Sequence, residues 1–600
     1  MATSGTGKHD ERVGSHGTFN HSCSGDDDAS GRHAEVDVPG DVISRGPASQ
    51  GTYPLGISRA VTRASSWLRA AFDRLVPPAT DEHATDTLDA AQPSSADDFR
   101  LLVRPALLGF LAIVAIVVGV AQPSSPFTLK MPGAWFFGVP SSSSPAATQQ
   151  GLFFGLVAVY GGLLLLMRVW YELTKTLSQR PRVQIKSLAI VFALWVVPLL
   201  VIPPLFSRDI YSYAAQGEMM SRGISPYRYG PDVLGAGGYV SQVDPLWGNA
   251  PAPYGPLFLL LDGLITKVSL HHELPNLIGL RLLELLGVVL IAVFIPKLAR
   301  AYGRDPGAAF ALAVLNPVVV LHLIGGAHND ALMLGLLVAG ITMAKKGRPV
   351  LGVILCTLAA AVKVPAALGV VYVGWQWMGP GIPWRQKLRP MITAGIISLG
   401  VMQLLAVITG LGWGWVLNLA TPGTVRSWLA PVTAIGLIGD HLAHALGIGI
   451  PGHVIISVAR VLGLGIAAAL GLMLLWKSDR VGPIKAMGLT LLLVVALGPV
   501  VQPWYLTWGL VIMAPVATGR LRSMIIWLSI CASFIGLPGG RQLVEELIHA
   551  NPVLAIASVI ALVAILGMPL RASTRLRDLY ARYQQRFSFS SADELVAGGK

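Results

Sequence analysis

Residues 101–121 read LLVRPALLGFLAIVAIVVGVA, and apolar stretches of similar length recur along most of the 600-residue chain. An α-helix needs about 20 such residues to cross the hydrocarbon core of a bilayer. The composition agrees with this pattern, because 53% of the residues are hydrophobic and only 13% are charged, against about 25% charged in soluble domains. The sequence therefore predicts an all-α polytopic membrane protein and excludes an ordinary soluble domain or a disordered chain.

Hydropathy divides the chain into fourteen predicted crossings. They are 103–121, 152–169, 187–205, 277–298, 307–325, 329–344, 349–363, 364–379, 390–411, 454–476, 483–501, 503–518, 522–538 and 552–570. With the N-terminus in the cytoplasm, 26 Lys and Arg residues lie inside and seven outside, which is the asymmetry that the positive-inside rule requires.

This topology holds only if two further apolar segments do not cross. Segments 254–268 and 432–446 each begin beside a proline, at Pro256 and Pro431. We predict that both lie along the outer surface or re-enter it, packed on protein. The outer face then carries three juxtamembrane elements, 122–151, 207–276 and 412–453.

The two ends of the chain differ from the apolar middle. Residues 1–98 are polar and are predicted to form a disordered cytoplasmic tail. Within it, 57–75 carries apolar and arginine residues at helical spacing, which indicates either an amphipathic helix on the inner membrane surface or a short helix in a loose tail. Residues 99–570 form the predicted membrane domain, and 571–600 a basic cytoplasmic tail.

The loop after the third predicted crossing carries the first group of polar candidates. Asp209 lies at the expected outer boundary of the membrane, where a carboxylate could accept a proton from a sugar hydroxyl as general base. It could equally cap a helix over 210–222, with Ser207 as the alternative cap, and spacing alone favours the cap. The same loop offers aromatic faces that suit either a sugar or the membrane interface, at Tyr211, Tyr213, Tyr227, Trp247 and Tyr254.

The second group, GGAHND at 325–330, joins the fifth and sixth predicted crossings on the same face. At a helix N-terminus His328 and Asn329 could hold an anion, and Asp330 could hold a metal or a sugar. The alternative is a tight helical hairpin in which Asn329 or Asp330 is the N-cap.

Further polar residues lie on the predicted outer side. Lys363 and Arg426, the latter near Trp428, would be costly among apolar residues unless paired. A lipid-linked phosphate could pair with them, or an internal carboxylate such as Asp330 or Asp209 could do so.

Two other patterns have ordinary structural interpretations. Arg281 and Glu284, one helical turn apart, are predicted to pair with each other. The sequence QPWY at 502–505 is interpreted as part of the aromatic belt.

No phosphate-binding loop, dinucleotide glycine pattern or zinc spacing is present, and the three cysteines are expected to be free. We therefore predict no cofactor and leave metal dependence open. Without a nucleotide site, a glycosyl donor used on the outer face would have to be linked to a lipid.

Several motifs together resemble one family. SRDIYSYAAQG at 207–217, SPY at 225–227, PYGPL at 253–257, GAHND at 326–330 and RSW at 426–428 are similar to motifs of the polyprenol-phosphate-mannose-dependent α-(1→6)-mannopyranosyltransferases of mycobacteria and corynebacteria. These belong to the GT-C superfamily of membrane glycosyltransferases. The resemblance covers about residues 100–575 and is stronger to the branch that begins the mannan backbone than to the branch that extends it.

The resemblance implies a GT-C fold in the plasma membrane, with both termini cytoplasmic and an active site facing the periplasm. It implies an inverting transfer of mannose from polyprenyl phosphate mannose to a phosphatidylinositol mannoside or lipomannan, without nucleic acid. Asp209 becomes the expected base, because the first outer loop, 122–151, contains no Asp or Glu. The expected substrate-binding and donor-binding residues are Arg208, Tyr211, Tyr213, Tyr227, Tyr254, His328, Asn329, Asp330, Lys363, Arg426 and Trp428.

Three alternatives remain open from the residues. A transferase of the same superfamily could use another polyprenyl phosphate sugar, such as arabinofuranose, because Asp, Tyr and Trp suit any sugar. A transporter would show inverted repeats and charges at mid-membrane, whereas this chain places most distinctive polar residues on one face. A non-catalytic scaffold would tolerate loss of Asp209.

Overall fold

The computed structural model describes residues 95–121, 149–179 and 183–535, all of which belong to one compact unit, Phe72–Lys600. The predicted helix over 57–75, the last crossing at 552–570 and the tail 571–600 lie outside the described residues, as do most of the tail 1–98 and most of the outer element 122–151. The described part is helical, with no strand among its residues.

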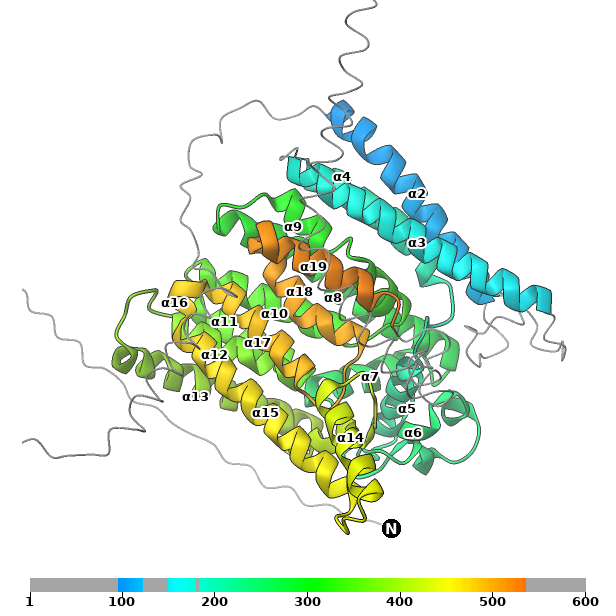
Figure 1. Cartoon of the computed structure of the whole chain (residues 1–600), viewed down its shortest axis with the longest axis vertical. Coiled ribbons are helices and arrows are strands. Elements are labelled where there is room, and N and C mark those ends of the chain that lie inside the picture. Colours follow the sequence, from blue (N-terminus) through cyan, green and yellow to red (C-terminus); the bar gives the residue numbers. More distant parts are fainter. Residues whose placement is uncertain (1–94, 122–148, 180–182, 536–600) are drawn as a thin grey trace, which may run out of the picture. The chain divides into compact units, whose positions relative to one another are not determined.

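The helices follow one another along the chain as Figure 1 shows. The first half comprises α2 (Ser95–Ala121), α3 (Gln149–Gln179), α4 (Ile185–Leu200), α5 (Asp209–Ser221), η2 (Pro231–Leu234), η3 (Gly238–Gln242), α6 (Pro245–Gly248), α7 (Pro256–Val268), α8 (Glu273–Ala301), α9 (Pro306–Ala313), the π-helix η4 (Val319–Gly325) and α10 (Asp330–Lys345). The second half comprises α11 (Pro349–Ala360), η5 (Val364–Ala366), α12 (Ala367–Gln376), α13 (Trp384–Thr409), η6 (Gly414–Thr424), α14 (Pro431–Ala445), α15 (Gly452–Trp476), α16 (Ser478–Val481), α17 (Pro483–Ala496), η7 (Pro503–Leu506), α18 (Thr507–Met513), η8 (Ala514–Val516) and α19 (Gly519–Ala532).

Five helices in the described ranges are long and apolar enough to cross a membrane, and a sixth crossing arises if η4 and α10, bent by 115°, count as one broken span. The five lie at Asp98–Ala121, Val157–Gln179, Glu273–Ala301, Trp384–Thr409 and Gly452–Trp476. Several other predicted crossings are apolar helices of only 10 to 17 residues. Membrane character is thus supported, while the count of fourteen crossings stays a prediction.

The two segments that the topology required not to cross are short helices. Segment 254–268 corresponds to α7 and segment 432–446 to α14, with 13 and 15 residues. At 1.5 Å per residue they are about 20 and 22 Å long, shorter than the roughly 30 Å hydrocarbon core. Since α11 and α17, which belong to predicted crossings, have only 12 and 14 residues, the lengths do not distinguish the two cases, and the surface position stays a prediction.

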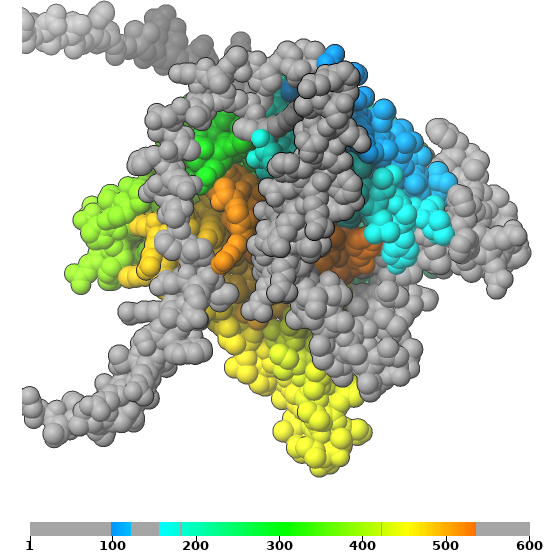
Figure 2. All heavy atoms as spheres, turned by 45° about the horizontal axis from the view of Figure 1, so that its top comes forward, coloured from blue at the N-terminus to red at the C-terminus, as the bar shows by residue number. Residues whose placement is uncertain are grey.

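The α14–α15 hairpin, yellow in Figure 2, carries many exposed apolar side chains. Val461, Leu462 and Leu472 on α15 are 69%, 62% and 66% exposed. Exposing many large apolar side chains on one helix to water is energetically costly, whereas contact of the same side chains with lipid is favourable. This face of α15 therefore fits a lipid-facing surface.

The helix α8 lies centrally, packing against α10, α9, η4 and α5. Beside it, α5 approaches α7 closely at Gly217, where an added Cβ would lie 2.6 Å from Thr266 Oγ1. These contacts bring the start of α5 and the start of α10, which carry Asp209 and Asp330, onto the same central helix.

Candidate active site

Asp209 is the first residue of α5, and its carboxylate is not a helix cap. The N-cap position is held by Arg208 without a side-chain cap bond, while the Asp209 N–H donates to Ser207 Oγ at 3.2 Å. The capping interpretation of Asp209 is therefore wrong, and the Ser207 hydroxyl satisfies the backbone instead. The carboxylate is left 22% exposed, with its Oδ2 3.4 Å from His328 Nδ1.

Two strained turns bring Asp209 and His328 together. Phe206, three residues before Asp209, has φ 60°, and Ala327, just before His328, has φ 52°. Residues with side chains seldom adopt this left-handed region, and such strain persists only where surrounding contacts hold it. A backbone hydrogen bond of 2.9 Å from Leu205 N–H to the Gly325 carbonyl ties the two turns together.

Arg281 on α8 holds the same two turns from the buried side. Its guanidinium donates to the carbonyls of Leu199 at 2.9 Å and Gly325 at 3.2 Å, and also to that of Ile202. The predicted pairing of Arg281 with Glu284 is wrong, because Glu284 Oε2 accepts from the Leu332 N–H at 3.1 Å and its Oε1 has no partner. Arg281 therefore positions backbone segments.

His328 is fully buried and stacks face to face on Trp504, with ring centroids 3.6 Å apart. Neither ring nitrogen makes a hydrogen bond within the described residues, so the approach of Asp209 is the polar contact nearest to Nδ1. The interpretation of 502–505 as ordinary aromatic belt is wrong for Trp504. This ring forms a wall of the site and fixes the plane of the imidazole.

Next to this pair lies a buried ion pair. Asp330, the first residue of α10, is 0% exposed and accepts from Lys363 Nζ at 2.8 Å and from Trp508 Nε1 at 2.5 Å. Lys363 also donates to Asn329 Oδ1 at 3.4 Å. Asn329 holds the N-cap position of α10, as predicted, but its side chain makes no cap bond and instead accepts from Lys363. The predicted internal pairing of Lys363 with Asp330 is confirmed.

Aromatic rings surround the ammonium of Lys363. Its Nζ lies 4.6 Å from the centroid of Tyr505 and 5.7 Å from that of Trp508. Cations are attracted to such ring faces. The sequence analysis missed Trp508, because a tryptophan inside an apolar run carries no signal that distinguishes a site from a helix core.

Three of the predicted sugar-contacting tyrosines instead form the protein wall. Tyr213 is 1% exposed and meets Tyr254 and Phe258 edge to face, at centroid distances of 5.2 and 5.1 Å. Tyr227 donates its hydroxyl to the Tyr254 carbonyl at 2.9 Å. These rings stiffen the segment between α5 and α7. Tyr213 and Tyr227 are buried, whereas Tyr254 is half-buried, with Lys363 Nζ 6.0 Å from its ring centroid.

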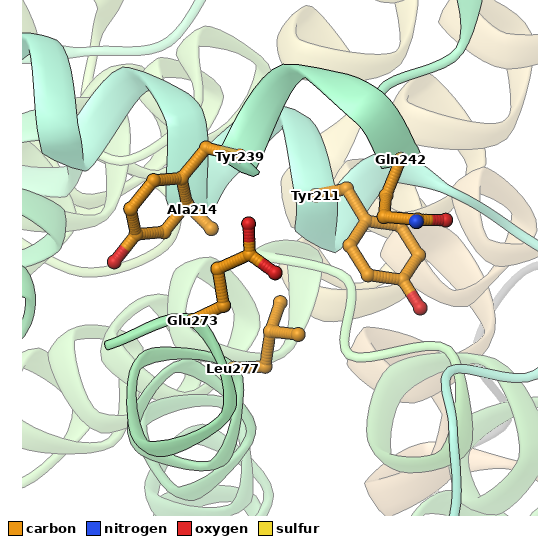
Figure 3. Close-up of a pocket in the computed structure, with 6 residues that line it drawn as sticks. All are labelled: Tyr211, Ala214, Tyr239, Gln242, Glu273 and Leu277. Atoms are coloured by element: carbon orange, nitrogen blue, oxygen red, sulfur yellow. The ribbon is translucent and has the colours of Figure 1, made fainter. Parts of the chain in front are cut away.

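Tyr211 lines a crevice that Figure 3 shows between α5, η3 and the start of α8. Gln242 and Glu273 line it as well, but the space is too narrow to admit a water molecule. Burial raises the pKa of Tyr211 well above its usual range, and that of Tyr239 in the same crevice to about 12. Both hydroxyls therefore stay protonated, and the crevice has no room for a sugar.

The remaining predicted residues lie at separate places. Arg208 donates from Nε to the Gln242 carbonyl at 2.8 Å and from Nη2 to the Val243 carbonyl at 3.0 Å. Arg426 is exposed, in the loop before α14. Trp428 lies 6.1 Å from the ring of His441. No contact within the described residues joins Arg426 or Trp428 to Asp209.

The arrangement suits proton transfer. The described residues contain no group of three His, Cys, Asp or Glu side chains placed to hold a metal ion. What they offer is a partly exposed carboxylate beside a buried imidazole, with an ion pair and three aromatic rings on the same side. A carboxylate in this setting can accept a proton from a hydroxyl brought to it from the accessible side.

Comparison with known proteins identifies the relatives of this chain. The profile of a family described as "Alpha-(1->6)-mannopyranosyltransferase, N-terminal domain" matches residues 106–379, and that of "MptB C-terminal domain" matches residues 432–567.

Individual relatives agree. Alpha-(1->6)-mannopyranosyltransferase A of Mycobacterium tuberculosis is 31% identical over 74% of this chain and 86% of its own length. Another alpha-(1->6)-mannopyranosyltransferase of the same organism is 30% identical over 71% of this chain and 80% of its own. Alpha-(1->6)-mannopyranosyltransferase B of Corynebacterium glutamicum is 31% identical over 60% of this chain and 64% of its own.

Proposed function

The chain belongs to the α-(1→6)-mannopyranosyltransferase family and is a hexosyltransferase, and on that basis we propose its substrates and catalytic group. The donor is polyprenyl phosphate mannose, and the acceptor is a lipid-anchored mannoside, a phosphatidylinositol mannoside or lipomannan. The reaction inverts the anomeric carbon and forms the α-(1→6) links of the lipomannan and lipoarabinomannan backbone. The enzyme has the GT-C fold and works at the periplasmic face of the bacterial plasma membrane.

The observation that carries this proposal is the contact between Asp209 and His328. Asp209 Oδ2 faces the buried imidazole at 3.4 Å, which leaves Oδ1 for the acceptor. As the acceptor oxygen attacks the anomeric carbon, its proton passes to Asp209, the bond from that carbon to the phosphate oxygen breaks, and polyprenyl phosphate leaves. His328, held flat by Trp504, orients the carboxylate and stabilises its charge before the transfer.

The direction of α10 supports a site on the outer side. This helix begins at Asp330 and ends at Lys345, followed by Lys346 and Arg348 in an exposed turn. Its 16 residues separate the buried ion pair from the basic turn by about 24 Å. With the basic turn at the cytoplasmic surface, the ion pair lies in the outer half of a membrane about 30 Å thick. A donor anchored in that leaflet could reach it.

Although Lys363 is paired with Asp330, we propose that it also binds the donor phosphate. An ammonium group has three N–H donors, of which one is directed to Asp330 and one to Asn329. The third could stabilise negative charge as it develops on the departing phosphate. Arg426 is a second candidate contact, from the exposed loop before α14.

The substitution Asp209→Asn tests the base. An asparagine keeps the size of the side chain but cannot take up the proton, so transfer of radiolabelled mannose should fall by about 10²- to 10⁴-fold. Asp440→Asn, a carboxylate on α14 outside the site, is the matched control and should keep full activity. Near-normal transfer by a folded Asp209→Asn protein would exclude the assigned role.

The substrate class is tested separately. The purified wild-type protein is given a panel of polyprenyl phosphate sugars, including mannose and arabinofuranose, with linkage analysis of the product. We expect transfer from polyprenyl phosphate mannose and an α-(1→6) link. Transfer from another sugar alone, or another linkage, contradicts the proposal.

A further inference from the structure

A polar cavity opens beside Arg208, on the side of the loop between α5 and α7. It has a volume of about 310 Å³ and is lined by Arg208, Asp232, Ser241, Asp244 and Gly248, among others. Ligand pockets usually have volumes of roughly 300 to 1,000 Å³. The cavity is thus large enough for a sugar residue, in contrast to the closed crevice beside Tyr211.

The two carboxylates that line this cavity keep free hydrogen-bond acceptor sites. The Asp232 carboxylate makes no hydrogen bond or ion pair within the described part of the chain, and the Asp244 carboxylate accepts only the N–H of Leu246, at 3.0 Å, to cap α6. Each therefore keeps lone pairs for a ligand. Hydrogen bonds from neutral hydroxyls to a carboxylate are stronger than those between neutral groups, and neighbouring hydroxyls on a pyranose ring can fill both oxygens of one carboxylate.

The Asp232 carboxylate lies directly against the backbone of α6 at Gly248. A Cβ at Gly248 would lie 2.5 Å from Asp232 Oδ1 and 2.6 Å from Oδ2. The absence of a side chain at Gly248 thus gives the Asp232 carboxylate room to lie against α6. Asp232 itself remains exposed and accessible to a ligand.

Arg208 connects the cavity to the proposed base. It lines the cavity with its side chain, is the residue directly before Asp209, and donates two hydrogen bonds to the carbonyls of Gln242 and Val243. Consecutive Cα atoms are about 3.8 Å apart. A glycan held in the cavity would therefore contact the residue that directly precedes the proposed base in the chain.

We propose that this cavity binds mannosyl units of the acceptor glycan, with Asp232 and Asp244 accepting hydrogen bonds from their hydroxyls. The inference rests on the proposed function, because it supplies the acceptor side of that reaction. It makes Asp232 a specificity-determining residue that contacts substrate without taking part in the proton transfer.

The test compares Asp232→Asn and Gly248→Ala with the control Asp440→Asn in the full-length purified protein. Asp232→Asn removes the charge, and Gly248→Ala displaces the carboxylate without removing it. Loss of a hydrogen bond to a charged group should raise the KM for a short α-(1→6)-mannoside acceptor about tenfold or more. The KM for polyprenyl phosphate mannose and kcat at saturating acceptor should stay within about twofold of wild type, because neither variant touches the proposed base.

Direct binding separates this inference from the proposed function. Saturation-transfer NMR with α-(1→6)-mannobiose should show binding to the wild type and the control, and a clear loss in both cavity variants. Unchanged acceptor KM, or unchanged mannobiose signals, would overturn the cavity assignment while wild-type transfer still supports the function. If the wild type transfers no mannose, the function fails, and the mannobiose signals alone decide for or against the cavity.

Discussion

At the scale of single residues, the buried pair of Asp330 and Lys363 shows what sets the form of the site. Removing two charges from water is costly, and their attraction offsets that cost only when the geometry is good and the remaining polar atoms are satisfied. Here Asp330 accepts from Trp508 as well as from Lys363, whose side chain is 13% exposed. Asn329 gives the ammonium a second acceptor. The buried ion pair is therefore favourable only while Asp330, Lys363 and their hydrogen-bond partners are all present.

Because each charge of the Asp330–Lys363 pair depends on the other, we predict the result of a double mutation. Lys363→Met should lower the free energy of unfolding by about 3 to 5 kcal/mol, because Asp330 is left buried without its cation. Combining it with Asp330→Asn should restore most of that loss, since the amide oxygen of the introduced asparagine can still accept from Trp508. Thermal unfolding of the detergent-purified proteins measures both. A single variant as stable as wild type, or a double variant no better than the single, would contradict the role of the pair.

The same residues show how far a sequence predicts a site. Asp209, His328, Asp330 and Lys363 stood out because polar side chains at the ends of apolar runs are costly and need a reason. Their contacts with Trp504 and Trp508 join segments that are far apart in the sequence. No local sequence pattern predicts such contacts. Tyr213 and Tyr227 were assigned to substrate because an aromatic ring looks alike in a sequence whether it faces a sugar or the core.

At the scale of elements, the site depends on the close approach of α8 and α10. A Cβ at Gly287 would lie 2.3 Å from the backbone of Ala331 and Leu332, and one at Gly335 would lie 2.4 Å from the Gly287 carbonyl. Small residues allow helix backbones to approach in membranes. Because Asp330 begins α10, this contact sets the position of the ion pair relative to Arg281 on α8.

Replacing Gly287 should therefore disturb both stability and activity. Gly287→Leu forces the two helices apart and should cost about 1 to 3 kcal/mol, with a larger fall in mannosyl transfer than Gly287→Ala causes. Gly400→Leu on α13 is the control, since a Cβ there meets nothing within 4 Å. Unfolding temperature and transfer rate are measured on the same samples. Equal behaviour of Gly287→Leu and Gly400→Leu would show that this contact does not support the site.

The prediction of elements succeeded where a helix is uninterrupted. The crossing predicted at 454–476 is α15, Gly452–Trp476. The one predicted at 307–325 is divided, because Asn316 Oδ1 accepts the Val318 N–H at 3.0 Å and a proline lies between them, so α9 ends and the π-helix η4 begins. Hydropathy averages over such a break and cannot show it.

At the scale of the whole molecule, function depends on which side of the membrane the site faces. The excess of Lys and Arg in alternate loops predicts the orientation. The structure adds that Asp330 and the basic turn after Lys345 lie at opposite ends of one helix. The proposed lipid-linked donor and the lack of a nucleotide motif agree with a position of the loop between α5 and α7 outside the cell.

Labelling of single cysteines in intact cells checks this orientation. In a variant without Cys23, Cys356 and Cys531, Asn249→Cys places a thiol on the exposed loop before α7, and Ser178→Cys places one at the exposed end of α3. A membrane-impermeant maleimide should label Asn249→Cys in intact cells and Ser178→Cys only after permeabilisation. The reverse pattern would put Asp209 on the cytoplasmic side, where sugar nucleotides are available, and the argument for a lipid-linked donor would no longer hold.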